Sequence, residues 1–154
     1  MKRWIAAVAA LVAACAWSNS LYQARTLSSQ ARDAERKDQP GQAVQLWGQV
    51  AVRAESAYAR APRGDRGAEA LWLEGHARAR ISDCAGAVPP LRGALALSPH
   101  ADWHEELLVE LAECEEAIGD PTTGGAYAAV IAGARDPAIL RAARIGEARA
   151  LVGA

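Results

Sequence analysis

Two histidines four residues apart are the side chains in this sequence whose types and spacing could support metal chemistry. In the segment His100-Ala101-Asp102-Trp103-His104, both imidazoles would share one face of a helix that began early enough, with Glu105 beside them. However, the segment follows Pro99, and Asp102 has the character of a helix N-cap, so exposed histidines at a helix start are the simpler interpretation. No third ligand lies at an accepted spacing, and we predict no metal ion here.

Other signatures of catalysis are missing from the sequence. It contains no Cys-x-x-Cys-His haem attachment segment, no glycine-rich phosphate loop, no Cys-x-x-Cys redox pair and no recognisable Ser/His/Asp arrangement. The formal net charge of -1 gives no indication of nucleic-acid binding. We therefore expect a protein that is not an enzyme, carries no cofactor and binds no nucleic acid.

The composition favours closely packed helices. Hydrophobic residues make up 51% of the 154 residues, but alanine dominates among them and phenylalanine is absent. No stretch alternates apolar and polar residues over five or more positions, so strands are not expected. The sequence predicts one all-α domain in which small side chains allow close helix–helix contact.

Residues 68–101 fit one helix–turn–helix unit of about 34 residues, counted from Ala68. Large residues stand fourth and twenty-fourth, small residues stand eighth, twentieth and twenty-seventh, and a proline stands thirty-second: Leu71, Leu91, Gly75, Ala87, Ala94 and Pro99. This pattern resembles the tetratricopeptide repeat (TPR). The resemblance implies two antiparallel helices, the second ended by Pro99, and a function in binding other proteins rather than in catalysis.

The resemblance extends more weakly over residues 20–152. A first unit, at about 24–61, would contain the inter-helix turn Asp38-Gln39-Pro40-Gly41, and a third unit would cover about 102–135. The turn of the third unit is about two residues longer than the pattern, and its second helix, near 126–134, lacks a large residue at its centre.

A last helix would follow at 137–152, with Asp136 as its N-cap and Pro137 at its first position. Four of its side chains would cover the open end of the stack: Leu140, Ala143, Ile145 and Leu151. We expect a short right-handed solenoid of about three TPR-like helix pairs plus this C-terminal capping helix.

Residues 1–17 have the features of an export signal. Lys2 and Arg3 precede an uncharged apolar run that is short for a membrane-spanning helix, and the run ends in Val12-Ala13-Ala14-Cys15. These four residues resemble the bacterial lipobox, which implies cleavage before a lipidated Cys15. Ordinary signal-peptidase cleavage, or an uncleaved anchor reaching Tyr22, are the alternatives. All three place the body of the protein on the periplasmic side of a bacterial membrane.

Lipidation of Cys15 would leave Cys84 and Cys114 as an even pair in an oxidising compartment. In the repeat register, Cys84 begins the second helix of the middle unit and Cys114 is tenth in the next unit. The two positions lie at the same end of two adjacent antiparallel helices. A disulfide is therefore expected, with two buried reduced cysteines as the alternative.

In the TPR family, the second, fifth, ninth, twelfth and thirteenth positions of each first helix line a concave groove. Applied here, the resemblance implies these partner-binding residues: Glu69, Trp72, His76, Arg80, Arg32, Arg36, Glu106, Glu113 and Glu116. Trp72 beside Arg80 would form an interface hot spot, unless Trp72 is buried against the neighbouring first helix. Trp47 occupies a position that packs between paired helices, so we expect it in the core.

Acidic residues gather between Arg92 and Arg135, where the sequence has no lysine or arginine. This segment is either a solvated helix face or an acidic docking surface for a basic partner. The sequence thus favours a membrane-associated adaptor or assembly factor that binds a protein partner in the bacterial envelope. The alternative is a structural accessory subunit of a membrane complex, held by an uncleaved N-terminal helix.

Overall fold

The computed structural model describes residues 20–120 and 123–153 of the chain. These residues form helices joined by short connections and contain no strand, which confirms the predicted all-α fold. The expected export signal at 1–17, with Cys15, lies outside the described residues. Within the described part, no helix is long and apolar enough to cross a membrane.

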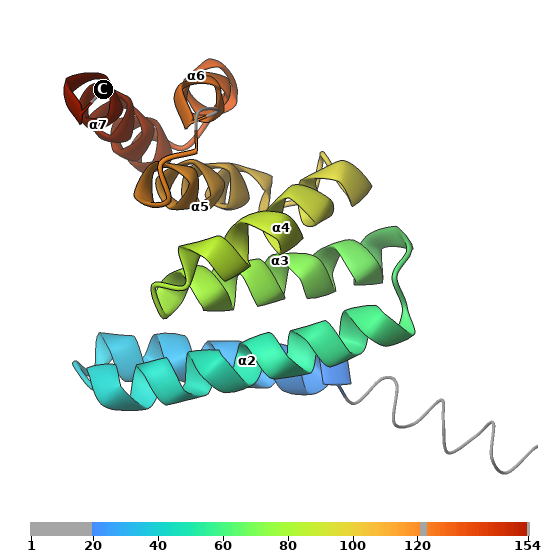
Figure 1. Cartoon of the computed structure of the whole chain (residues 1–154). Coiled ribbons are helices and arrows are strands. Elements are labelled where there is room, and N and C mark those ends of the chain that lie inside the picture. The colour runs from blue at the N-terminus through green and yellow to red at the C-terminus, as the bar shows by residue number, and fades with distance from the viewer. Residues whose placement is uncertain (1–19, 121–122, 154) are drawn as a thin grey trace, which may run out of the picture.

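The helices are stacked in the order of the sequence, from the first helix at one end to α7 at the other (Figure 1). The first helix covers residues 20–36 of the described chain. It is followed by α2 (Pro40–Arg60), α3 (Gly64–Arg80), α4 (Cys84–Leu97), α5 (His104–Ala117), α6 (Thr123–Gly133) and α7 (Pro137–Gly153).

Local sequence signals explain several helix ends. Asp83 caps α4 by accepting a hydrogen bond from the backbone N–H of Gly86 at 3.0 Å. Asp136 caps α7 in the same way through the N–H of Ala138, with Pro137 at the first helical position as predicted. Gly119 follows the end of α5 with a φ of 69°, a conformation that glycine adopts without steric cost.

Two predicted boundaries are wrong. Pro40 and Gly41 were expected in the turn between the first two helices, but they begin α2. Proline suits the first position of a helix, because the backbone N–H at that position makes no hydrogen bond within the helix. Asp102 is not the N-cap of α5: the helix begins at His104, and Trp103 occupies the cap position without a side-chain hydrogen bond. The indole of Trp103 packs on Trp72 of α3 instead.

The core consists of three clusters in sequence order, and α3 and α5 each contribute to two of them. The first cluster joins the first helix, α2 and α3 around Trp47, which is 1% exposed and therefore a core residue as predicted. The second joins α3, α4 and α5 around Leu91. The third joins α5, α6 and α7 around Tyr127, which is completely buried.

The third cluster corrects the predictions for the C-terminal helices. Tyr127 supplies the large central side chain that α6 was expected to lack. On α7, Ala143 is buried as predicted, but Ile145 and Leu151 are exposed. The reason is the register of α7, whose buried Ala143 faces α6 and turns Ile145 and Leu151 toward solvent.

The predicted disulfide is present. Cys84, at the first position of α4, is bonded to Cys114 in α5, and their Cα atoms are 4.8 Å apart. The bond joins the middle of the stack across the α4–α5 contact. It therefore links α5 covalently to α4, and α3 packs against α4 and also touches α5 directly.

Candidate functional site

Polar and aromatic side chains follow one face of α3. Glu69, Trp72, His76 and Arg80 are spaced three or four residues apart, so the helix brings them to the same side. On the facing helix α5, Glu106 and Glu110 are also four residues apart. The side chains between the two helices form what we call the His76 cluster: Trp72, His76, Trp103, Glu106 and Glu110.

The imidazole of His76 is held between two indoles. Its ring centroid lies 4.9 Å from that of Trp47, edge to face, and 5.6 Å from that of Trp72. Trp72 in turn stacks on Trp103, with centroids 5.3 Å apart and planes within 7°. Aromatic packing on both sides fixes the ring of His76, whose side chain is only 4% exposed.

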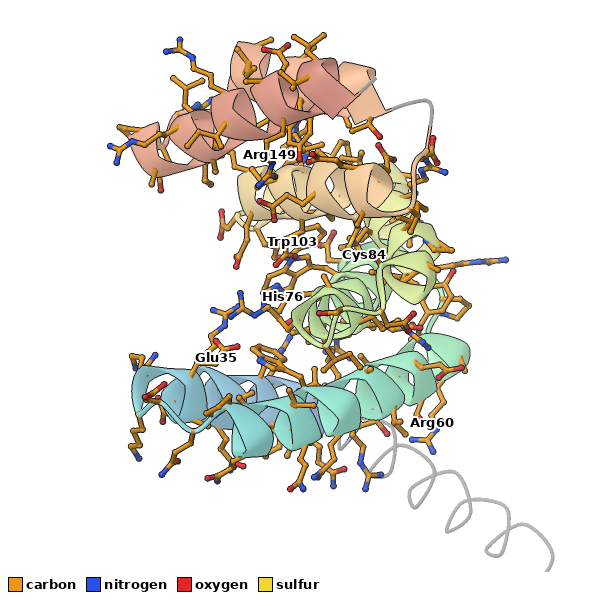
Figure 2. All side chains as sticks on the ribbon, turned by 60° about the vertical axis from the view of Figure 1, so that its left-hand side comes forward. Glu35, Arg60, His76, Cys84, Trp103 and Arg149 are labelled. Carbon is orange, nitrogen blue, oxygen red and sulfur yellow. A yellow bond between two sulfur atoms is a disulfide. The ribbon has the colours of Figure 1, made fainter. Side chains whose placement is uncertain are left out.

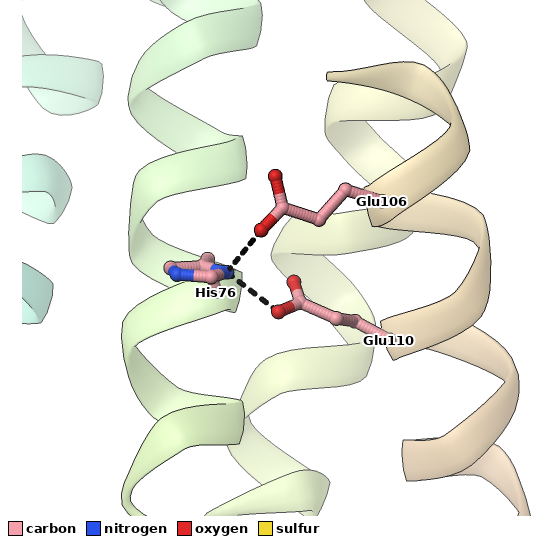
Figure 3. A group of neighbouring side chains, drawn as sticks. All are labelled: His76, Glu106 and Glu110. Atoms are coloured by element: carbon pink, nitrogen blue, oxygen red, sulfur yellow. Dashed lines mark ion pairs between the residues drawn. The ribbon is translucent and has the colours of Figure 1, made fainter. Parts of the chain in front are cut away.

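Two carboxylates of α5 approach the Nδ1 atom of His76 (Figure 3). Oε1 of Glu110 lies 2.6 Å from Nδ1, and Oε1 of Glu106 lies 3.9 Å from it. The Nδ1–Oε1 contact with Glu110 is short, yet the two atoms do not meet hydrogen-bond geometry, so Nδ1 remains a buried atom without a hydrogen-bond partner. Oε2 of Glu110 is buried and unpartnered as well.

Trp72 is partly buried between α3 and α5 rather than displayed as a free interface side chain. Its Nε1 is buried and donates no hydrogen bond. Packing against Trp103 and His76 explains this position, which combines the two interpretations offered by the sequence: Trp72 lies on the predicted face, and it also packs against the next helix.

Ion pairs connect the first helix to α3 and α5 on this side of the stack. Arg25 binds Glu69 through two hydrogen bonds, and Arg80 donates to Oε1 of Glu35 at 2.7 Å. A looser pair, at 3.9 Å, joins Arg32 to Glu106. Most of the charged residues predicted to face a partner thus already have an ion-pair partner within the free protein.

Glu35 links three helices through one carboxylate oxygen. Its Oε1 accepts hydrogen bonds from Nε1 of Trp47 in α2, at 2.8 Å, and from Arg80 in α3. Partial burial works to raise the pKa of Glu35, but the hydrogen bonds from Arg80 and Trp47 outweigh it, and the pKa is lowered. Glu35 is therefore held as an anion beside the ring that packs on His76.

Figure 2 shows Glu35, His76, Trp103 and Arg149 along one side of the stack, whereas Arg60 lies at the far end of α2. Arg149 donates to Oε2 of Glu116, which also accepts a hydrogen bond from the hydroxyl of Tyr127. The polar face thus continues from the first helix through α3 and α5 to α7.

The structure brings together six of the sequence-predicted site residues on this face: Glu69, Trp72, His76, Arg80, Arg32 and Glu106. Arg36 does not join them, because it pairs with Asp33 of its own helix. Glu116 is engaged by α7, and Glu113 is exposed. Desolvation, followed by repulsion from Glu110 and Glu116, raises the pKa of Glu113.

Most carboxylates of the acidic segment have partners inside the protein. Arg92 binds both Glu115, which is 3% exposed, and Asp120. Oε2 of Glu105 accepts the backbone N–H groups of Arg135 and Asp136 at the start of α7. The segment is therefore only in small part a free acidic surface, because its charges mainly fix α5 against α4 and the α6–α7 connection.

The histidine pair singled out by the sequence does not form a helical i, i+4 pair, because His100 precedes α5 and His104 begins it. Both histidines line a cleft of about 610 Å³ between the start of α5 and α6. Among the described residues, the group that brings three metal-ligating side chains together is a different one, made of His76, Glu106 and Glu110.

Sequence reasoning missed two members of the cluster, Glu110 and Trp103. Glu110 does not stand at a position that the TPR resemblance predicts to line a groove, although its spacing of four from Glu106 placed both on one face of a helix. Trp103 lies just before α5, in a segment whose path no local rule predicts.

Comparison with known proteins returned no match: no family model, no curated protein and no solved structure is similar enough to this chain to be assigned to it. The function has to be argued from the geometry alone.

Proposed function

We propose that this protein is a non-enzymatic adaptor or assembly factor of the bacterial envelope, and that it binds a protein partner through the face formed by the first helix, α3 and α5. It would be anchored on the periplasmic side of a membrane by lipidated Cys15 or by its N-terminal helix. In this proposal the helices form about three TPR-like pairs and a capping helix, and the polar face lines the TPR groove.

The contacts among helices support the repeat arrangement. α3 packs against α4 and also touches α5, and α5 packs against α6 and also touches α7. Contact between the first helices of consecutive pairs is the arrangement by which helical repeats build a continuous binding face. Gly75, at the small eighth position of the middle unit, lies directly against Leu91 of α4, as close pairing requires.

The observation that carries the proposal is the continuous polar and aromatic face itself. Arginine, glutamate and tryptophan side chains from three helices meet there, and about half of the side chains of Arg32 and Glu106 stays exposed, at 42% and 45%. The Arg32–Glu106 pair is long and solvated, so a charged partner segment can replace it at little cost. Arginine and tryptophan are also the residue types that dominate binding energy at interfaces.

The test is to crosslink intact cells that carry a C-terminal tag, extract with mild detergent and identify co-purifying proteins by mass spectrometry. The double variant Arg32→Ala/Arg80→Ala should lose at least about 90% of the captured partner, because removing hot-spot arginines costs about 2 kcal/mol or more. Arg53→Ala, an exposed change on α2, is the matched control. Unchanged capture by the double variant, with a native circular dichroism spectrum, would contradict the proposal.

The second candidate is a structural accessory subunit of a membrane complex, held by an uncleaved N-terminal helix. One observation favours it: Ile145, Leu151 and Val152 on α7 are 55%, 76% and 90% exposed. Ile145 and Val152, seven residues apart, lie on the same side of the helix, and exposed apolar surface of this kind can serve as a contact surface. Mass spectrometry of the same preparation distinguishes the two, since this candidate requires a chain that begins at Met1 and capture that depends on Ile145 and Leu151.

A further inference from the structure

We propose that His76, Glu106 and Glu110 form a binding site for one divalent transition-metal ion of the Zn²⁺ type. The three side chains come from two helices, and one ligand atom from each lies within 4.8 Å of the other two. Figure 3 shows both carboxylates converging on the same nitrogen from α5. Zinc binds its ligand atoms at about 2.0–2.2 Å, so the Glu110 carboxylate, now 2.6 Å from Nδ1, would move away to admit the ion, and the Glu106 carboxylate, now 3.9 Å from Nδ1, would move toward it.

The ring of His76 is already held in position for this role. Its side chain is only 4% exposed, and it packs against Trp47 and Trp72. Its Nδ1 is directed at α5 and has no hydrogen-bond partner. A buried polar atom without a hydrogen-bond partner destabilises the fold, and binding of a cation would offset this cost.

Glu110 presents the same signature from the other helix. Its side chain is 13% exposed, and Oε2 is buried without a partner. His76 and Glu110 therefore meet in one short contact, between Nδ1 and Oε1, and yet Nδ1 and the other carboxylate oxygen, Oε2, are buried without a hydrogen bond. A single cation coordinated by Nδ1 and by the Glu110 carboxylate satisfies both groups at once.

The balance of charge also favours a cation. Glu106 and Glu110 bring two carboxylates to the site, and the pair between Glu106 and Arg32 is loose, at 3.9 Å. An imidazole nitrogen combined with two carboxylates suits Zn²⁺ and its first-row neighbours, whereas Mg²⁺ and Ca²⁺ prefer oxygen ligands alone. Three protein ligands leave a fourth position for water or for a side chain of a partner.

The ion would connect α3 directly to α5, whereas the Cys84–Cys114 bond connects α4 to α5. The structural consequence is a more rigid polar face. The site is separate from His100 and His104, which do not join a three-ligand group in the described residues.

The proposal is tested with the purified full chain after treatment with EDTA, by calorimetric titration with ZnCl₂. We expect one equivalent to bind, and Glu106→Gln and Glu110→Gln each to weaken binding at least about tenfold, because glutamine keeps the shape but loses the charge of the ligand. Glu113→Gln, one turn further along α5, is the matched control and should bind within about twofold of the unchanged protein.

Tryptophan fluorescence locates the ion independently of the calorimetry. Bound Co²⁺ should quench the emission of the protein, since Trp47 and Trp72 flank His76, and the quenching should disappear in Glu110→Gln and persist in His100→Gln/His104→Gln. Absence of Zn²⁺ binding up to about 100 µM, an affinity of Glu110→Gln equal to that of the unchanged protein, or loss of binding only in the His100/His104 variant would each overturn the proposal.

Discussion

A methyl group added at Gly75 tests how closely α3 and α4 approach each other. A Cβ atom at this position would lie 2.5 Å from Cγ of Leu91, 2.7 Å from its Cδ2 and 3.1 Å from its backbone nitrogen. Carbon atoms in favourable contact are about 3.5–4.0 Å apart, so the overlap is about 1 Å. Leu91 is completely buried, and its backbone nitrogen cannot move without α4.

The expected effect of Gly75→Ala is a balance of two terms. Overpacking of a tight core costs about 1–3 kcal/mol, whereas alanine in a helix interior is favoured over glycine by about 0.5–1 kcal/mol. The net destabilisation is therefore about 1–2 kcal/mol. Gly48 offers a matched control in α2, because a Cβ there meets no atom within 4 Å. Gly48→Ala should stabilise the protein by about 0.5–1 kcal/mol.

The assay is urea unfolding followed by tryptophan fluorescence and by circular dichroism at 222 nm. The two alanine variants should move in opposite directions and differ by about 2–3 kcal/mol in free energy of unfolding, or roughly 8 °C in Tm. If Gly75→Ala is as stable as Gly48→Ala, then α3 and α4 do not pair as closely as the structure indicates. The assignment of Gly75 to the small eighth position of the proposed repeat would then be wrong as well.

Three further predictions concern the disulfide and two buried carboxylates. Reducing the Cys84–Cys114 bond, which closes a separation of 30 residues, should lower the free energy of unfolding by about 3.6 kcal/mol, as measured by urea unfolding with and without reductant. Alkylation of both thiols in unreduced protein would contradict it. Burial raises the pKa of Glu74, so its ionised form disfavours the fold, and stability is lost as pH rises through this raised pKa. Glu74→Gln should therefore raise Tm at pH 7, and the gain should vanish near pH 4 in a pH series of thermal melts; an equal gain at both pH values would refute this reason. Arg92→Met should cost about 2 kcal/mol in a urea titration, because it leaves Glu115 buried with an uncompensated charge; an unchanged midpoint would show that the pair is not structural.

Much of the fold could be predicted from local patterns. The positions of Gly75, Leu91 and Pro99 placed α3, α4 and the end of α4 within a few residues, because spacing and capping are local properties of the chain. The pairing of Cys84 with Cys114 followed once the helices were in register. Where the pattern weakened, beyond α5, the predictions became poorer, and Tyr127 was missed as the centre of the last cluster.

The candidate site was predicted only in part. Periodicity placed Glu69, Trp72, His76 and Arg80 on one face of α3, because residues three and four apart are neighbours on any helix. It could not show that the basic residues of the first helix would pair with the acidic residues of α3 and α5, since such pairing depends on the distance between helices. The spacing of His100 and His104 suggested that both could lie on one face of a helix. They do not, because α5 begins at His104 and His100 precedes it.

The sequence by itself determined the helical class, the approximate extent of most helices and the polar side of α3. These properties depend on interactions between residues close along the chain, such as caps, helix propensity and periodicity. Only the tertiary structure decided that Trp47 and Trp72 hold the ring of His76 from two sides, and that Glu106 and Glu110 face its Nδ1 from another helix. The site residues come from three segments of the chain, at 47, 72–76 and 106–110, that are about 25 to 60 positions apart. They meet because the stacking of α3 on α5 is set by core side chains outside the site, such as Leu91 and Leu107.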